Sequence, residues 1–401
     1  MIKRTIEISR EPAHLSLRLG QLVLEREHQP VSTIPCEDLG MVVVDHPQVS
    51  YTHSALAALV EHDAVVVICG KNHLPAGLLL PMSDHSEVVW RLHDQIAVSK
   101  PLRKQLWRQI VQAKIRAQAA NLSKGSPERT RLLELARTVK SGDVTNHEAQ
   151  AARVFWSAWL PDDEQTRDGF KTTKLTRSVS EGVSEGVSEG VSEGVSEGVS
   201  EGVGTSSVES PSLTLRVTSV TATRQRSPFR RNADGEDEIN VLLNYGYSIL
   251  RAAVARAIVM AGLHPAFGLQ HCNRSNLFCL ADDLMEPLRP LVDARVRELV
   301  RLNQTELSPI TKAALLQLLT QEATTGSEAR PLMVTLHRYV ASLVKCYAGE
   351  SEQLEIPEYV HSPFDPKSVE STSPSTSRSW AASRRHARQI AAANELANRP
   401  F

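Results

Sequence analysis

The chain has 401 residues, of which 41% are hydrophobic, and this is enough for two or more packed domains. Its 45 Lys+Arg and 46 Asp+Glu give a formal charge of −1, which neither supports nor excludes a nucleic-acid partner. The N-terminal MIKRTIEISREP lacks the apolar core of a signal peptide, and no run approaches about eighteen apolar residues, so we expect no membrane association. Five scattered cysteines without a CxxC pair indicate reduced thiols and a cytoplasmic location.

Residues 1–85 are predicted to form a small N-terminal β-sheet domain. Leu15, Leu17 and Leu19 alternate with polar residues, and short β-branched runs follow at 41–44 and 65–68. The segment LSLRLGQLVLE indicates a hairpin that turns at Gly20. One short helix is expected near 54–61.

From about residue 86 the hydrophobic period becomes that of a helix, and 86–168 is predicted to be the first part of a helical domain. Apolar residues recur every four positions from Leu102 to Ile110. The basic residues among them are Arg103, Lys104, Arg108, Lys114 and Arg116. Such a face is usually an ordinary solvated surface, and the functional alternative is contact with phosphates.

A second helix is expected over 127–140, with Gly142 ending it. The next helix begins at GDVTNHEAQAAR, where Thr145-x-x-Glu148 matches a capping box. By spacing alone, capping explains Glu148 better than catalysis does. Farther along this helix, Phe155 and Trp159 are interpreted as core anchors.

Residues 169–232 are predicted to be a flexible insertion within the helical domain. The unit VSEG occurs six times from Val179 to Gly202, and such a repeat buries too little apolar surface to fold. Loop closure costs only about 0.6 kcal/mol per doubling of length, so a fold tolerates a long insertion.

The second part of the helical domain is predicted at 233–349. A long helix starts near Ile239 and ends at Gly262, with Pro265 beyond it. Tyr245 and Tyr247 are interpreted as polar groups satisfied within the bundle, in preference to recombinase-type nucleophiles. Further helices are expected at 292–302, 310–321 and 331–348, and 350–401 reads as a mostly disordered tail.

The stretch HCNRSNLFCLADDLMEPLRP, residues 271–290, concentrates an imidazole and several carboxylates. If DDLMEP begins a helix, Asp283 and Glu286 share one face about a turn apart, within reach of His271. This ligand set suits Mg²⁺ or Mn²⁺ better than structural zinc, although Cys272 and Cys279 flank it. The alternative is that the acids merely favour a helix N-terminus.

Three segments together resemble the CRISPR-associated integrase family, the metal-dependent DNA endonucleases that insert spacers into a CRISPR array. They are GDVTNHEAQAAR, LLNYGYSILRAAVARAIVMAGLHPAFG and HCNRSNLFCLADDLMEPLRPLVD. Their residues are most similar to those of the type II branch. The resemblance implies an α+β protein with a small N-terminal β-sheet domain and a larger all-α catalytic domain. The low-complexity insertion and the long tail are not features of the family.

By the same resemblance, the metal and catalytic residues are Glu148, His271 and Glu286, with Asp283 as a further ligand or a neighbouring support. The ion would be Mg²⁺ or Mn²⁺. The choice of direct ligand between Asp283 and Glu286 stays open. Arg289 and Asn244 are expected to support the site.

The family's chemistry implies double-stranded and branched DNA as substrates. A 3′-hydroxyl would attack a phosphodiester to join a fragment to the array, and water would give nicking instead. The implied partners are a second copy in a homodimer, a small ferredoxin-like adaptation subunit in a heterohexamer, and the RNA-guided effector. Arg103, Lys104 and Arg108 become candidates for phosphate contact.

Two other hypotheses stand beside this one. The protein could be a non-catalytic DNA-binding scaffold of the adaptation complex, in which the insertion has spoiled the site. Alternatively, it is an unrelated helical protein whose acids only cap helices.

Overall fold

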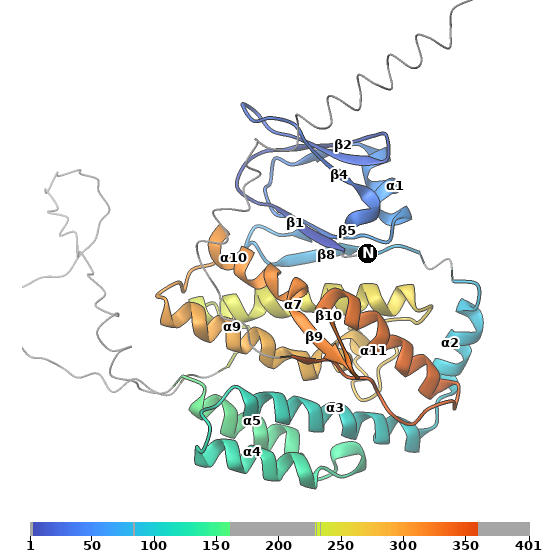
Figure 1. Cartoon of the computed structure of the whole chain (residues 1–401), viewed down its shortest axis with the longest axis vertical. Helices are drawn as coiled ribbons and strands as arrows, with labels where there is room; N and C mark the ends of the chain where they lie inside the picture. The colour runs from blue at the N-terminus through green and yellow to red at the C-terminus, as the bar shows by residue number, and fades with distance from the viewer. Residues whose placement is uncertain (1–2, 83–84, 161–228, 230, 233, 360–401) are drawn as a thin grey trace, which may run out of the picture. The chain divides into compact units, whose positions relative to one another are not determined.

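The computed structural model describes residues 3–82, 85–160, 229, 231–232 and 234–359 (Figure 1). The VSEG repeat lies outside these described residues, so its predicted flexibility stays a prediction. No helix in the described ranges has the length and apolar character that crossing a bilayer requires.

Two four-stranded sheets make up the N-terminal part, one ordered β1-β5-β7-β8 and the other β4-β3-β2-β6. β1, β5 and β7 run parallel, and β8 closes that sheet as an antiparallel edge. The helix predicted near 54–61 is confirmed as α1 (His53–Glu61). The strands are β1 (Arg4–Ile8), β2 (His14–Arg18), β3 (Gln21–Glu25), β4 (Ser32–Pro35), β5 (Leu39–Val44), β6 (Ser50–Tyr51), β7 (Val65–Cys69) and β8 (Pro75–Leu79).

The predicted hairpin is confirmed, with β2 and β3 antiparallel and Leu17 opposite Leu22. Its two-residue loop places Leu19 and Gly20 at φ 51° and 71°. Hairpin turns of this length favour such positive φ values because they match the twist of the strands.

The sheet that contains β5 is buried on both faces. Val42 and Val66 face the core shared with the second sheet, whereas their neighbours Met41, Val43 and Val65 belong to the core of the helical part. Side chains alternate between the faces of a strand, so one short apolar run supplies two cores.

The helical part begins with α2 and runs to α11, with short 3₁₀ turns between some helices. The apolar period predicted from Leu102 is confirmed, because Leu106, Ile110 and Val111 are fully buried. The helices are α2 (Val88–Ala97), α3 (Lys100–Ala120), α4 (Pro127–Thr138), α5 (His147–Ala158), α7 (Glu238–Met260), α8 (Cys279–Met285), α9 (Arg289–Arg301), α10 (Pro309–Leu316) and α11 (Leu332–Tyr347).

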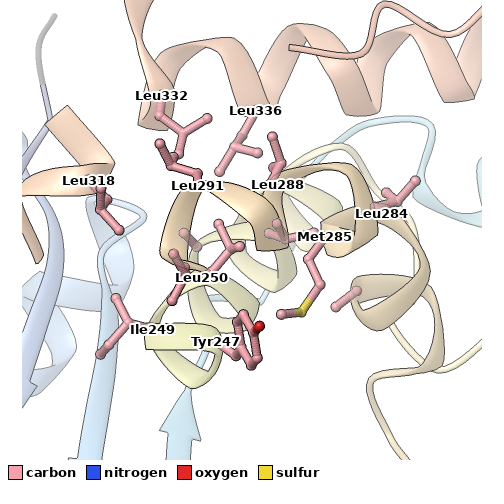
Figure 2. Close-up of a cluster of buried hydrophobic side chains, with 14 of the residues drawn as sticks. Tyr247, Ile249, Leu250, Leu284, Met285, Leu288, Leu291, Leu318, Leu332 and Leu336 are labelled. Atoms are coloured by element: carbon pink, nitrogen blue, oxygen red, sulfur yellow. The ribbon is translucent and has the colours of Figure 1, made fainter. Parts of the chain in front are cut away.

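Helix α7 supplies the centre of the helical core, as Figure 2 shows. Ile249 and Leu250 of α7 lie among leucines of the segment from α8 to α9 and of α11. Gly246 packs so closely against α9 that an added Cβ would lie 2.5 Å from Val292 Cγ1. The helix predicted from about 239 to Gly262 is confirmed as α7.

The prediction of an all-α second domain is wrong in one respect. A three-stranded sheet, ordered β10-β9-β11, is formed by β9 (Glu322–Thr325), β10 (Glu328–Pro331) and β11 (Glu358–Tyr359). These strands have two to four residues and few buried side chains, too little for alternation to be recognised. The Gly326-Ser327 pair between β9 and β10, with Gly326 at φ 64°, was the available hairpin signal.

The described structure continues past residue 349, where the helical domain was predicted to end. β11 pairs with β9, and Gln109 of α3 bonds the chain before it, accepting from Leu354 N at 2.9 Å and donating to Glu352 O at 2.8 Å. Residues 350–359 therefore belong to the helical part. Residues 360–401 lie outside the described residues.

A buried ion pair ties the N-terminal sheet to the helical part. Lys312 Nζ of α10 donates to Asp45 Oδ2, and both side chains are almost fully buried. His73 Nδ1 lies 3.0 Å from the other oxygen of Asp45. Glu7 lies nearby, with its Oε1 buried and without a hydrogen-bond partner among the described residues. Burial raises the pKa of Glu7 to about 7, although the charge of Lys312 opposes the shift.

We predict that Glu7→Gln stabilises the protein above pH 7 by about 1–2 kcal/mol. A carboxyl whose folded pKa is above its unfolded value of 4.5 contributes stability below pH 4.5, and this contribution is lost as pH rises to about 7. The melting temperature should therefore fall less in the variant than in the wild type as the pH rises from 4.5 to 8. The matched control is Glu25→Gln, an exposed residue of β3. A pH profile parallel to that of the wild type would contradict the prediction.

Candidate functional site

Three separate elements place two carboxylates around one ammonium group. Lys114 Nζ on α3 lies 2.6 Å from Glu148 Oε1 on α5 and 2.5 Å from Glu286 Oε2, just after α8. All three side chains are at least three-quarters buried. Burial alone would lower the pKa of Lys114, but the charges of Glu286 and Glu148 outweigh it and raise that pKa, so the amine is charged.

The predicted capping box at Glu148 is wrong. Asn146, at a left-handed φ of 53°, is the N-cap of α5, and its side chain accepts from Ala149 N. Asp143 accepts from His147 N at 2.8 Å and from Glu148 N at 2.9 Å. Because the Asp143 carboxylate satisfies these free amides, the Glu148 side chain is available to face Lys114.

His271 is held by Asp283, which is fully buried on α8. Asp283 Oδ2 accepts from Leu269 N at 2.6 Å and from Gln270 N at 2.9 Å, and Oδ1 lies 2.5 Å from His271 Nδ1. An Nδ1–H donated to Asp283 leaves Nε2 as the ring nitrogen with a lone pair. The hydrogen bond to Asp283 is the main cause that raises the pKa of His271, and the charges of Glu286 and Glu148 add to it.

Glu286 is held on its other side by Arg289. Arg289 Nε lies 2.8 Å from Glu286 Oε1, and its guanidinium stacks on Tyr247, 4.7 Å from the ring centroid. Burial would raise the pKa of Glu286, yet the charges of Arg289 and Lys114 prevail and lower it to about 2. Glu286 is therefore an anion in spite of its burial.

Tyr247 belongs to the wall behind this site. Its hydroxyl donates to Asp293 Oδ1, and burial raises the pKa of Tyr247, so this hydroxyl is a poor nucleophile. Arg231 stacks on the same ring and donates to Asn244 Oδ1 at 2.6 Å. Thus Arg289 contacts a candidate ligand directly, whereas the contact of Asn244 is with Arg231.

The structure brings Glu148 near His271 and Glu286, which follow it by more than a hundred residues in sequence. Trp107 of α3 packs edge-on against the His271 ring, with centroids 5.7 Å apart. Asp283 is adjacent, but both of its oxygens accept hydrogen bonds from the loop that carries His271. These contacts favour Glu286 over Asp283 as a side chain open to a ligand.

Sequence reasoning grouped Lys114 with the solvated basic face of α3 and missed its place in the site. Residues 107, 110, 111, 114 and 115 share the buried helix face, so a lysine within this stripe was the signal. By contrast, Lys104 is exposed. The Nε atoms of Arg103 and Arg108 are buried and have no hydrogen-bond partner within the described ranges.

The donor types fit a hard divalent ion, since two carboxylates face one ammonium group and their charges also act on the nearby His271 imidazole. Glu286 Oε2 is buried, and Lys114 Nζ lies 2.5 Å from it. As the side chains stand, however, no three His, Cys, Asp or Glu residues among those described are grouped closely enough to hold a metal. Lys114 lies between the two glutamates.

The amino-acid sequence is similar to that of a known protein family. A family described as "CRISPR associated protein Cas1" matches residues 6–171 and 218–325. The CRISPR-associated endonuclease Cas1 of Neisseria meningitidis serogroup C is 29% identical over 349 residues, covering 86% of this chain and 92% of that relative.

Solved structures share the fold. A casposase bound to integration product has a TM-score of 0.63 at 17% identity, over 92% of this chain and 98% of that one. A chain of a Cas6-RT-Cas1–Cas2 complex has a TM-score of 0.60 at 16% identity, over 89% of this chain and 36% of that one. These matches confirm the mixed α and β architecture with an N-terminal sheet part and a helical part.

Asp283→Ala is predicted to cost about 2–4 kcal/mol of stability. It removes the acceptor of the Leu269 and Gln270 amides and the partner of His271. Chemical denaturation should show the loss, and hydrogen exchange at 269–271 should become faster. Asp94→Ala, at a half-exposed residue of α2, is the control and should change stability by less than about 0.5 kcal/mol. Equal stabilities of the two variants would contradict the role of Asp283.

Proposed function

Because the chain belongs to the Cas1 family of CRISPR-associated proteins, we propose that it is a divalent-metal-dependent DNA endonuclease and integrase of spacer acquisition. The observation that carries this proposal is that Glu148 and Glu286 face each other across Lys114, with the half-exposed His271 near enough for both carboxylates to raise its pKa. The family predicted from three sequence segments is confirmed, and the type II Cas1 of Neisseria meningitidis matches over most of the chain.

Glu148, Glu286 and the Nε2 of His271 are the proposed ligands of Mg²⁺ or Mn²⁺. Such an ion supplies Lewis-acid activation of a phosphodiester and neutralises charge as the phosphorus–oxygen bonds exchange. Asp283 fixes the His271 ring through Nδ1 and is the supporting group. Arg289 holds Glu286 by Oε1, which leaves Oε2 facing the site.

The proposed reaction is a transesterification. The 3′-hydroxyl oxygen of an incoming DNA fragment forms a bond to a phosphorus of the array, and the bond to the array's own 3′-oxygen breaks. The proton lost by the attacking hydroxyl is balanced by the proton that the leaving 3′-oxygen gains. With water as the nucleophile, the same displacement nicks DNA.

Double-stranded and branched DNA are the proposed substrates. Arg103 and Arg108 of α3, with Nε atoms that lack partners within the described ranges, are the proposed phosphate contacts, together with the exposed Lys104. A small Cas2-like subunit is a proposed partner, because a chain of similar fold belongs to a Cas6-RT-Cas1–Cas2 complex. The resemblance to the family adds a second copy in a homodimer.

One observation favours the alternative of a non-catalytic DNA-binding scaffold. Lys114 stands between the two carboxylates that would hold the ion, and no metal-binding group of side chains is formed among the described residues. Under this alternative the protein binds branched DNA equally well with and without divalent ions and releases no strand.

A disintegration assay on branched DNA, with Mn²⁺, Mg²⁺ or EDTA, tests the proposal. Glu148→Gln, His271→Ala and Glu286→Gln should each lower metal-dependent strand release by at least about 100-fold, because each removes a ligand. Glu134→Gln, on the exposed surface of α4, is the control. Wild-type rates in all three variants, or strand release in EDTA, would refute the proposal.

A further inference from the structure

Lys114 is the unexpected member of the site. It is a buried lysine on the apolar stripe of α3, beside Ile110, Val111 and Ile115, all of which are fully buried. A lysine there is costly to bury without partners, and its partners are the two proposed metal ligands from different elements. Packing alone does not explain a charge at this position.

We infer that Lys114 occupies the cation position of the site in the metal-free protein, and that divalent-ion binding displaces its ammonium group toward a DNA phosphate. The inference rests on the proposed metal-dependent function and adds a residue that links metal binding to DNA binding.

Distances support the first half of the inference. The ammonium nitrogen lies 2.5–2.6 Å from one oxygen of each glutamate. A Mg²⁺ ion would bind the same oxygens at about 2.0–2.1 Å. A metal ion and the ammonium group therefore cannot share the space between these oxygens, and the like charges repel each other.

Charge balance supports the second half. Glu148 and Glu286 carry two negative charges, which Lys114 and Arg289 neutralise. Among these four groups, a bound divalent ion would leave two positive charges in excess within surroundings of low dielectric. Phosphodiesters of DNA supply the missing negative charge, and the flexible stem of lysine lets its ammonium group follow them.

Arg289 is a poor candidate for the same movement. Its guanidinium is stacked on Tyr247 and paired with Glu286 Oε1, on the side away from Lys114. In the described part of the chain no ring stacks on Lys114, and its two partners are the residues that the metal would engage. Of these two cations, Lys114 is therefore the one that a metal replaces.

The consequence is a reciprocal coupling. In the wild type, Mn²⁺ should bind weakly to the protein alone and more tightly when DNA is present, because DNA accepts the displaced ammonium group. Lys114→Met removes the competing charge. The variant should bind Mn²⁺ at least about 5-fold more tightly than the wild type without DNA, and should gain less affinity when DNA is added.

Titration of the full-length protein with Mn²⁺, followed by the electron paramagnetic resonance signal of free Mn²⁺, measures both affinities without relying on activity. It is performed with and without a short branched DNA. Lys124→Met is the matched control, because Lys124 is an exposed lysine in the loop after α3. Lys114→Gln, which keeps an N–H donor but not the charge, replaces Lys114→Met if the latter does not fold.

A second readout tests the contact with phosphate. In Mn²⁺, the slope of log affinity for DNA against log salt should be shallower by about 0.9 in Lys114→Met, as expected for one lost phosphate contact. In EDTA, where Lys114 stays between the glutamates, the slopes of variant and wild type should agree.

The outcomes separate the two proposals. Equal or weaker Mn²⁺ binding by Lys114→Met, with a wild type that binds Mn²⁺ and transfers strands, overturns the role of Lys114 and leaves the proposed function intact. Tighter Mn²⁺ binding with an unchanged salt slope overturns the movement to phosphate. A wild type that binds no Mn²⁺ and releases no strand overturns the proposed function itself.

Discussion

The pairing of buried charges around Glu286 is the constraint on which the site depends. Two carboxylates brought face to face in a protein interior repel each other and lose hydration, so the fold must supply cations for both. Lys114 and Arg289 do so from opposite sides, and each comes from a different helix. The convergence of α3, α5 and the α8–α9 junction is therefore as much an electrostatic requirement as a matter of hydrophobic packing.

The loop that carries His271 is organised by a single buried side chain. Asp283 acts as an acceptor for successive backbone amides, the kind of anchoring that a loop without regular structure needs. The same carboxylate orients the imidazole. Asp283 thus both supports the loop and orients His271. For this reason the sequence alone could not show whether Asp283 is a metal ligand or a supporting group.

Elements with strong periodicity were predicted well from the sequence. The hairpin at Gly20, the helix over α7 and the amphipathic α3 follow from spacing that local physics determines. The sheet of β9, β10 and β11 was missed because its strands are very short and β11 comes from a segment that reads as a tail. Pairing with β9 over a sequence separation of more than thirty residues leaves no local pattern.

Site residues that lie close together in sequence were also predicted better than those that only tertiary contacts bring together. His271 and the acids of the following helix stand close together in sequence, so their chemistry was visible as a motif. Glu148 had an equally good local explanation as a capping residue, and only the tertiary contact with Lys114, together with the cap made by Asp143, distinguishes the two. The place of Lys114 depends on three elements meeting, which no single stretch of sequence encodes.

The sheet with two buried faces makes the N-terminal and helical parts depend on each other for packing. Met41, Val43 and Val65 point into the helical core, so the boundary between the parts in sequence does not coincide with a boundary in packing. A fragment that stops near residue 85 would expose this apolar face to solvent and invite aggregation. Exchange of the N-terminal part with that of a distant relative would likewise require matching changes in the helices that pack on it.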